Sequence, residues 1–467
     1  FSAAEERVFA ERDGELVGFA SEYLIARCLG RVGSPDQPVV FCPEEEQFYR
    51  YAPESGLYES ISPAKVRHEV VKLLRKCAEG SLQHYRAEIH ALCTRRVVSL
   101  VADALKAESE MGVSEFEPDY HVIPVENGML DLRTLRLDPF SPQRPVRSKL
   151  PIRWDEHAAP PTQFLGYVES MFRAEEDRRL LIDSLAMAFL GNPFQRIVVI
   201  LGPGGAGKTT LVKLLISLIG IGDTAQFNPA KAHRPFEPVS WIGKKLLYVT
   251  EAKENSLLGC SQQLKEISGQ DTITAEFKSS NMWISFTPRS LLMVTGNPDL
   301  RLRIEQDRDA WERRLLLLRV VKPQNLAPIP DFDQHLIRTE GPGILKVVVE
   351  AAQRLIRDGM PKLSLEQDRR VKHLLDASDP FAEFVSVHVE DQVESCVYTA
   401  DAYAAAKEFL SRNEYSEPSK GELQKRVTRA MEEAGYTTSN SLKKCPDKST
   451  RGWRRIRLRA RSEVPGY

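Results

Sequence analysis

A glycine-rich segment followed by a lysine and two threonines is the part of the sequence best suited to chemistry. Residues 202–210 are Gly-Pro-Gly-Gly-Ala-Gly-Lys-Thr-Thr, which fits the pattern G-x-x-x-x-G-K-[ST]. In that pattern backbone N–H groups surround the phosphates, the lysine reaches the β- and γ-phosphates, and the next hydroxyl holds Mg²⁺. We therefore predict a nucleotide site with ATP and Mg²⁺ as cofactors. The residues expected to form it are Gly202, Pro203, Gly204, Gly205, Ala206, Gly207, Lys208, Thr209 and Thr210.

The residues on both sides of this segment predict the elements that must position it. Residues 196–201 form an apolar, β-branched run that is typical of a buried strand, and residues 210–219 are typical of a helix. A strand leading in and a helix leading out would place the helix N-terminus, with its favourable dipole, at the phosphates. The alternative is a glycine-rich turn that binds nothing, and the strand–loop–helix context argues against it.

Two further strands are expected to deliver polar groups to the same place. The strand predicted at 244–251 ends in Glu251, which would orient the attacking water and support Mg²⁺, together with Thr209. The position before it, where an acid is usual, is Thr250. The strand predicted at 290–297 ends in Asn297, an uncharged amide suited to hold that water. The alternatives are an acid that merely ends a strand and an ordinary Asn-Pro turn.

Two other features suit a triphosphate and a nucleic acid. Arg313 and Arg314 precede a terminal apolar strand, a position from which an arginine can reach the γ-phosphate of a neighbouring subunit. Residues 273–286 predict a strand pair whose tip carries Lys278, with Trp283 beside it. Such a tip can contact a phosphate and stack a base. Surface arginines and a solvated loop are the alternatives for these two features.

Composition and length limit the class of protein. The 467 residues include 64 Lys and Arg against 65 Asp and Glu, so a uniformly basic nucleic-acid coat is excluded and any polyanion site must be local. The length predicts about three domains. Seven cysteines without a C-x-x-C pair indicate reduced thiols in a cytoplasmic protein, and no apolar stretch reaches the ~20 residues of a membrane span. Strands and helices alternate from 196 to about 320, which predicts an α/β core.

The flanking regions predict an N-terminal α+β unit and a small C-terminal unit. Helical spacing at 16–31 and 63–76, and hairpins around 46–58 and 127–137, favour a mixed N-terminal part. After Asp379-Pro380 we expect three helices, one of them capped by Ser419, and a Trp-bearing hairpin.

A basic cluster lies near the C-terminal end of the sequence. Residues 440–461 hold nine Lys or Arg against one acid. This local excess around Trp453 predicts the wing of a winged helix with its basic face on DNA phosphates, whereas a solvated charged face is the alternative. The basic residues expected at DNA are Lys443, Lys444, Arg451, Arg454 and Arg455.

In their order, these segments resemble superfamily 3 helicases of the poxvirus and satellite-phage primase–helicase type. The shared order is the glycine-rich loop, the strand ending in Glu251, Lys265-x-x-Ser-Gly-Gln-Asp271 with its hairpin, the Thr-Gly-Asn297 strand and Trp-Glu-Arg-Arg314. Outside this core, Glu126-Asn-Gly-Met-Leu-Asp-Leu132 and Glu340-Gly-Pro-Gly-Ile-Leu345 also resemble the family.

The resemblance implies an AAA+-like P-loop NTPase core at 161–375, an α+β domain at 1–160 and a winged-helix-like domain at 376–467. It implies that Lys208 and Thr209 bind nucleotide and Mg²⁺, that Glu251 activates water and that Asn297 is the polar sensor. It also implies that Arg313 or Arg314 acts on a neighbouring subunit, and that Lys278 tracks single-stranded DNA in the channel of a hexamer moving 3′→5′.

We therefore expect an ATP-dependent DNA helicase that replicates a phage, plasmid or integrated element and binds single-stranded and forked DNA as a homo-hexamer. The alternatives are a replication initiator or loader ATPase without processive unwinding, and a nucleotide-dependent assembly switch. The basic 440–461 segment and Lys278 argue against the switch. If the parent protein synthesises primers, the primase module is expected upstream of Phe1 or on a separate replication protein, because Asp331-Phe-Asp333 lies in a predicted solvated loop without flanking strands.

Overall fold

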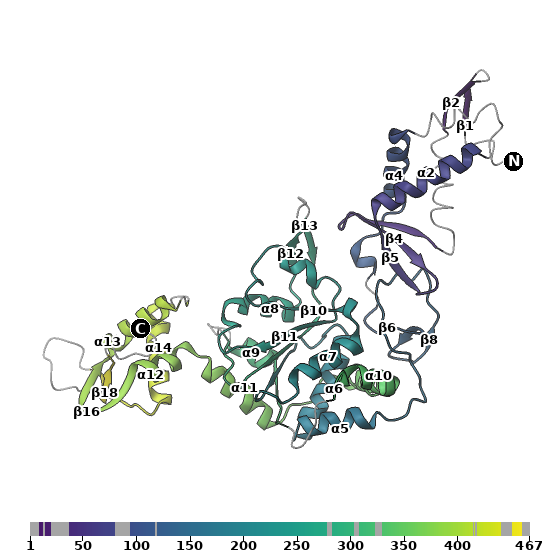
Figure 1. Cartoon of the computed structure of the whole chain (residues 1–467). Coiled ribbons are helices and arrows are strands. Elements are labelled where there is room, and N and C mark those ends of the chain that lie inside the picture. The colour runs from purple at the N-terminus through teal and green to yellow at the C-terminus, as the bar shows by residue number, and fades with distance from the viewer. Residues whose placement is uncertain are drawn as a thin grey trace.

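A computed structural model gives the fold. It describes residues 9–12, 15–19, 37–79, 94–116, 119–277, 283–302, 308–322, 329–413, 415, 418–439 and 451–459. Figure 1 shows three groups of elements in chain order, with a central sheet and its helices between an N-terminal and a smaller C-terminal group. The expected α/β fold with a parallel sheet is confirmed.

The central sheet has five strands, all parallel, in the order β10-β11-β14-β9-β15. The strands are apolar along almost their whole length because both faces of the sheet are covered. Since they are parallel, their carboxyl ends meet at one edge. Their bounds are β9 (Ile197–Leu201), β10 (Thr224–Gln226), β11 (Leu246–Ala252), β14 (Leu291–Gly296) and β15 (Leu315–Arg319).

Helices cover both faces of this sheet, and successive residues of each strand point to opposite faces. Val198 and Ile200 pack on the side of α5, α6, α7 and α10, whereas Ile197 and Val199 pack on the side of α8, α9 and α11. The helices are α5 (Thr162–Met171), α6 (Glu175–Phe189), α7 (Lys208–Ile219), α8 (Ser261–Gly269), α9 (Arg308–Arg314), α10 (Phe332–Asp358) and α11 (Leu365–Ala377), with short 3-10 turns η3 (Ile221–Asp223), η4 (Glu237–Trp241) and η5 (Leu258–Cys260).

The expected solvated loop at Asp331-Phe-Asp333 is corrected by the start of α10. Asp331 is the N-cap residue of that helix, and Asp333 lies in its first turn. The Ser217 hydroxyl donates to the Asp333 carboxylate at 3.3 Å. An acid in the first turn is favoured by the helix dipole, which gives Asp333 a structural role.

The N-terminal part contains two small antiparallel sheets, β3-β4-β5 and β6-β7-β8, and a β1–β2 hairpin. The helix expected at 63–76 and the two expected hairpins are confirmed. Strand β2 replaces the first residues, 16–19, of the helix predicted at 16–31, because antiparallel pairing with β1 outweighs the helical spacing there. The rest of that prediction, residues 20–31, lies outside the described residues. The elements are β1 (Phe9–Arg12), β2 (Glu15–Phe19), β3 (Val39–Cys42), β4 (Gln47–Ala52), β5 (Leu57–Ile61), α2 (Pro63–Glu79), α4 (Arg95–Glu108), η2 (Val113–Phe116), β6 (Val122–Val125), β7 (Gly128–Asp131) and β8 (Leu137–Asp138).

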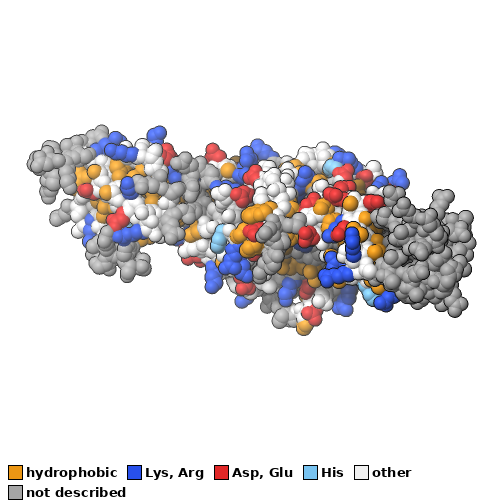
Figure 2. All heavy atoms as spheres, turned by 90° about the horizontal axis from the view of Figure 1, so that it is seen from above, with side chains coloured by type: hydrophobic (Ala, Val, Ile, Leu, Met, Phe, Trp, Pro, Cys, Tyr) orange, Lys and Arg blue, Asp and Glu red, His pale blue; other side chains and the backbone are white. Residues whose placement is uncertain are grey.

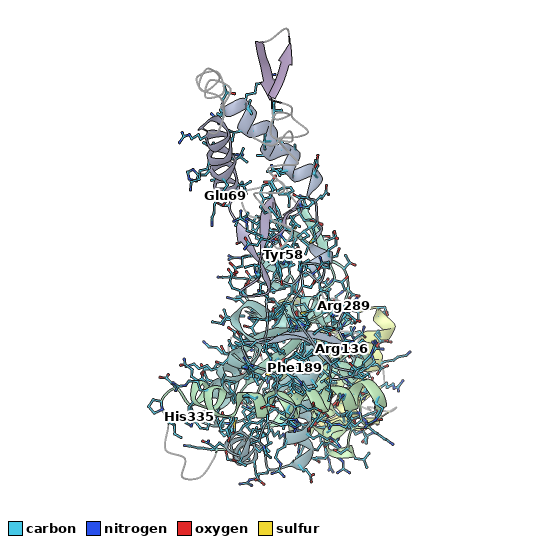
Figure 3. The ribbon with its side chains drawn as sticks, turned by 90° about the vertical axis from the view of Figure 1, so that its right-hand side faces the viewer. Tyr58, Glu69, Arg136, Phe189, Arg289 and His335 are labelled. Carbon is cyan, nitrogen blue, oxygen red and sulfur yellow. The ribbon has the colours of Figure 1, made fainter. Side chains whose placement is uncertain are left out.

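The first of these sheets shares an apolar cluster with a hairpin of the central part. The hairpin pairs β12 (Ile273–Glu276) with β13 (Trp283–Phe286). Its Ala275 and Ile284 are buried together with Tyr51 and Tyr58 of β4 and β5. In Figure 3, Tyr58 lies between Glu69 of α2 and Arg289, which follows β13 in the chain. The hairpin and the N-terminal sheet are therefore packed as one unit.

The C-terminal part has its own core around Trp453 and Ile456. The three expected helices and the cap at Ser419 are confirmed, and β17 and β18 form the Trp-bearing pair. Strand β16 was not predicted, because its polar sequence shows no clear alternation. The order in the sheet is β16-β18-β17. The elements are α12 (Pro380–His388), β16 (Val389–Tyr398), α13 (Thr399–Arg412), α14 (Lys420–Glu433), β17 (Thr438–Ser439) and β18 (Gly452–Leu458).

The surface is mixed in charge. On the face in Figure 2, basic and acidic side chains are interspersed over the described residues. Within the described part of the chain, no helix has the length and apolar character needed to cross a membrane.

A buried ion pair fastens the layers beside the sheet. Asp177 of α6 is 1% exposed and accepts hydrogen bonds from Nη1 of Arg370 in α11 at 2.8 and 2.9 Å. It also accepts from the backbone N–H of Arg319 in β15 at 3.4 Å. Burial raises the pKa of Asp177, and the Arg370 guanidinium acts in the opposite direction. The pair thus joins two helices to an edge strand.

We predict that Arg370→Met lowers the stability of the central part by about 3–5 kcal/mol at neutral pH, because it leaves a buried carboxylate without its partner. Differential scanning calorimetry measures the loss as a lower unfolding temperature. The double variant Asp177→Asn/Arg370→Met is the control, and it should recover most of the loss because no charge remains buried. An unchanged unfolding temperature for Arg370→Met would contradict this account.

Candidate functional site

The glycine-rich loop joins β9 to α7 at the carboxyl edge of the sheet. Gly205 and Gly207 have φ of +73° and +85°, values that favour glycine. At Gly202 an added Cβ would lie 2.4 Å from Cγ2 of Val320, so only glycine lets the loop pass this close to the end of β15. Gly207 is the N-cap residue of α7. The loop therefore directs the N-terminus of that helix to the space above the sheet.

Lys208, Thr209 and Glu251 surround one space. Lys208 is 8% exposed, and its Nζ donates to the carbonyl oxygens of Gly202 and Pro203 at 2.6 and 2.9 Å. Burial lowers the pKa of the Lys208 ammonium, and the Glu251 carboxylate acts in the opposite direction. The Thr209 hydroxyl donates to Oε1 of Glu251 at 3.4 Å. A cation and a hydroxyl from the first turn of α7 are thus brought together with a carboxylate from β11.

Glu251 owes its place to an irregularity in β11. The register of β11 against β14 shifts between Val249 and Ala252, and Glu251 has a φ of +54°. A bulge of this kind re-aims a side chain that regular pleating would direct elsewhere. The sequence indicated a strand that ends in this acid, whereas the observed strand continues to Ala252 and turns Glu251 toward the loop by the bulge.

The space is a cavity of about 880 Å³. Four neighbouring strands, β11, β14, β9 and β15, end beside it. Asn297, directly after β14, is exposed and lies on the cavity wall. The predicted residues that line the cavity are Gly204, Gly205, Ala206, Gly207, Lys208, Thr209, Thr210, Glu251 and Asn297.

One wall of the cavity was not predicted. Helix α5 presents Tyr167, whose hydroxyl donates to the Gly207 carbonyl at 3.2 Å. Burial raises the pKa of Tyr167. Its ring meets Phe332 edge to face with centroids 5.3 Å apart, and Lys322 after β15 completes this side. The available signal was the recurrence of Gln163, Tyr167 and Ser170 on one face of α5, but such spacing is as typical of packing as of binding.

The donors present fit a magnesium ion. Mg²⁺ prefers oxygen ligands and usually keeps water and phosphate oxygens beside one or two protein groups. The Thr209 hydroxyl and the Glu251 carboxylate, 3.4 Å apart, match that requirement. Among the described residues, no group of three or more His, Cys, Asp and Glu side chains is arranged to hold a metal. The two protein oxygens of Thr209 and Glu251 suit a cation whose other ligands are water or phosphate oxygens.

Arg313 and Arg314 lie away from the cavity of their own chain. They end α9 and precede β15, so they lie at the amino edge of the sheet. The length of β15 separates this edge from the carboxyl edge by about 17 Å, at ~3.3 Å per residue. The Arg314 guanidinium donates to the Ala310 carbonyl at 3.3 Å and is half-buried, whereas the Arg313 side chain is exposed.

The hairpin offers exposed aromatic surface. Trp283 of β13 is 60% exposed, and Lys278 lies outside the described residues. The loop before η4, which was not predicted as part of this region, adds Phe236 at 43% exposure. The Pro235 carbonyl accepts from the backbone N–H of Glu276 at 3.0 Å, which ties that loop to β12.

The distinctive segment before the hairpin serves as its anchor. The Gln270 side chain donates to the carbonyls of Gly191 and Asn192 at 2.8 and 3.1 Å. The Ser268 hydroxyl donates to the Leu264 carbonyl at 2.8 Å within α8. The Gln270 side chain therefore fixes the end of α8, which leads into the hairpin, to the turn between α6 and β9.

The basic C-terminal segment is only partly available for a ligand. Lys443 and Lys444 lie outside the described residues, whereas Arg451, Arg454 and Arg455 are exposed. The extended backbone of β18 is interrupted at Arg455, which has a φ of +61°. Two further arginines of the segment, Arg457 and Arg459, form ion pairs with Glu390 instead.

Two family models match parts of the chain. Residues 22–173 match the family described as "D5 N terminal like". Residues 200–314, which contain the glycine-rich loop, Glu251, Asn297 and both arginines, match a "Family of unknown function (DUF5906)". None of the curated proteins compared with the chain matches it.

Solved structures of the NrS-1 C terminal region are similar to the chain at 12% sequence identity. "The A form apo structure of NrS-1 C terminal region-CTR" has a TM-score of 0.48 and aligns over 87% of this chain and 86% of that one. "The apo structure of NrS-1 C terminal region (305-718)" has a TM-score of 0.49 and aligns over 93% and 98%. The family-level similarity of this chain therefore lies in residues 22–173, to the D5 N terminal like proteins, and in residues 200–314.

Proposed function

We propose that this chain is an ATP-dependent DNA helicase of phage or mobile-element replication, built on an AAA+-like P-loop core. The observation that carries the proposal is the convergence of Lys208, Thr209, Glu251 and Asn297 on one cavity. The order of motifs, which resembles superfamily 3 helicases, and the match of residues 22–173 to the D5 N terminal like family support the same assignment.

Each side chain has a role in this proposal. Lys208 leaves the loop carbonyls and neutralises the β- and γ-phosphates, as in other glycine-rich phosphate loops. Glu251 orients the attacking water and accepts its proton, and Asn297 holds that water in line with the γ-phosphate. Thr209 and Glu251 would hold Mg²⁺, which when bound neutralises charge on the phosphates.

The proposal includes a ring of identical subunits, taken as a hexamer. Arg313 and Arg314 lie at the amino edge of the sheet, away from the cavity of their own chain. An arginine at that edge can stabilise the γ-phosphate only of a neighbouring copy. We assign this role to Arg313, because its side chain is exposed while Arg314 is held by the Ala310 carbonyl.

DNA contacts are proposed at two places. Trp283 of β13 and Phe236, whose loop is bonded to β12, would stack bases of a single strand moving 3′→5′ through the ring, and Lys278, between the two strands in the sequence, would track its phosphates. The C-terminal helix–strand–helix–helix–strand–strand unit would act as a winged helix, with Arg451, Arg454 and Arg455 on fork or duplex phosphates.

The nucleotide site is tested by Lys208→Ala, with Lys213→Ala as the matched control because Lys213 is exposed on the same helix. We expect Lys208→Ala to lower the rate of ATP hydrolysis by a factor on the order of 100 or more, since a cation at the phosphates is lost. Phosphate release measures the rate of hydrolysis, and titration with a fluorescent ATP analogue measures nucleotide binding. Wild-type hydrolysis by Lys208→Ala would contradict the assignment of the cavity.

Helicase activity is tested by strand displacement on forks with a single 3′ or 5′ tail, in ATP and Mg²⁺. We expect displacement from the 3′-tailed fork alone, none with Lys208→Ala, and a reduced rate with Trp283→Ala because a stacking surface is removed. ATP hydrolysis without displacement from either fork would contradict the helicase assignment and favour an initiator or loader ATPase.

The action of Arg313 on a neighbour is tested by mixing inactive variants. Arg313→Ala should lower the rate of hydrolysis on the order of 10³-fold without weakening nucleotide binding. Co-assembly with Lys208→Ala should restore part of the activity, because the latter subunit supplies an intact Arg313 to its neighbour's intact cavity. Recovery with Arg314→Ala but not with Arg313→Ala would transfer the role to Arg314.

A further inference from the structure

We propose that Thr295 is the positioning residue that holds Glu251 in the site, an inference that rests on the proposed ATPase function. Thr295 lies in β14, one residue before Gly296 and two before Asn297, and is 1% exposed. It does not line the cavity. Its effect on the reaction would therefore pass through the neighbouring strand.

The Thr295 hydroxyl occupies the gap that the bulge opens in the sheet. Val249 pairs with Val294 and Ala252 pairs with Gly296, so that Thr250 and Glu251 together face Thr295. The Thr295 Oγ1 accepts the backbone N–H of Glu251 at 3.2 Å and donates to the Val249 carbonyl at 3.3 Å. The hydroxyl thus replaces, with one donor and one acceptor, the ladder bonds that the bulge disrupts.

This pairing bears directly on the orientation of the acid. Glu251 has a φ of +54°, a conformation that is unfavourable for a residue with a Cβ and that persists only when its surroundings enforce it. Without the hydroxyl, the part-buried N–H of Glu251 and the buried carbonyl of Val249 lose this partner. Regular pairing of β11 would then be favoured, and a change of one residue in register moves a side chain to the opposite face of the sheet. The hydroxyl therefore keeps the Glu251 carboxylate beside Thr209.

Residues 295–297 also position the start of the phosphate loop and the Asn297 amide. Gly296 accepts the backbone N–H of Gly202 at 3.3 Å, and Asn297 lies on the cavity wall. Residues 295–297 thus touch the acid, the start of the phosphate loop and the cavity in succession. Because the three contacts come from one stretch of backbone, that stretch resists displacement of Glu251, the phosphate loop or Asn297 relative to one another.

The test replaces the hydroxyl by a methyl group of similar size, Thr295→Val. We expect the kcat for ATP hydrolysis to fall about 10–100-fold, the range for loss of a group that orients a reacting residue, with the affinity for a fluorescent ATP analogue nearly unchanged. Thr295→Ser keeps the hydroxyl and should restore most of the rate. Thr224→Val is the matched control, because Thr224 is a buried threonine of β10 whose hydroxyl bonds to the Ile221 carbonyl at 3.5 Å.

A Glu251→Gln background separates positioning from general damage to the fold. Because Thr295 acts through Glu251, Thr295→Val should lower the single-turnover rate of Glu251→Gln no further. Thr295→Ala serves as a second hydroxyl-free variant if Thr295→Val lowers the unfolding temperature. Wild-type kcat in both hydroxyl-free variants, or an equal loss in the Glu251→Gln background, would overturn the inference. Absence of hydrolysis by the wild-type chain itself would instead overturn the proposed function.

Discussion

Parallel pairing of the five central strands is the constraint on which the site depends. In a parallel sheet all carboxyl ends meet at one edge, so residues far apart in the sequence are brought together without any contact of their own. Lys208 begins α7 after the loop that follows β9, Glu251 is the last residue but one of β11, and Asn297 follows β14. If one of these strands ran in the opposite direction, its polar residue would lie at the other edge, where Arg313 and Arg314 are found.

The regular part of the sheet supports a small irregular part at its edge. Strands β9, β14 and β15 are buried along almost their whole length, and β9 pairs with β14 and β15 without interruption. The unfavourable backbone of Glu251 and the left-handed glycines of the loop are confined to the carboxyl edge. Strain of this kind persists when the surroundings over-determine it, and it is concentrated where chemistry needs a fixed geometry. The apolar core thus stabilises conformations that these residues would not adopt alone.

The sequence predicted the elements with strong local signals, and it missed those set by non-local packing. The glycine-rich loop, the strands around it, the helix at 63–76 and the Ser419 cap follow from spacing and residue type. Strand β2 was mistaken for a helix because its partner β1 decides the outcome. The bulge at Glu251 and the part played by Tyr167 depend on neighbours remote in the chain. The helical spacing around Tyr167 does not distinguish binding from packing, and the bulge has no periodic signal at all.

The N-terminal sheet β3-β4-β5 and the β12–β13 hairpin share an apolar core. The sheet has no assigned role, whereas the hairpin is proposed to contact DNA. Ala275 and Ile284 on one side of the hairpin are buried against Tyr51 and Tyr58, while Trp283 on the other side is exposed. Side chains of a strand alternate between faces, so the same hairpin presents an apolar side to the N-terminal sheet and an aromatic side to solvent. If the exposed side of the hairpin moves, the N-terminal sheet must therefore move with it, or the buried cluster must open. Opening the cluster costs free energy in proportion to the apolar area that becomes exposed. The N-terminal part is in this way a mechanical support of the hairpin.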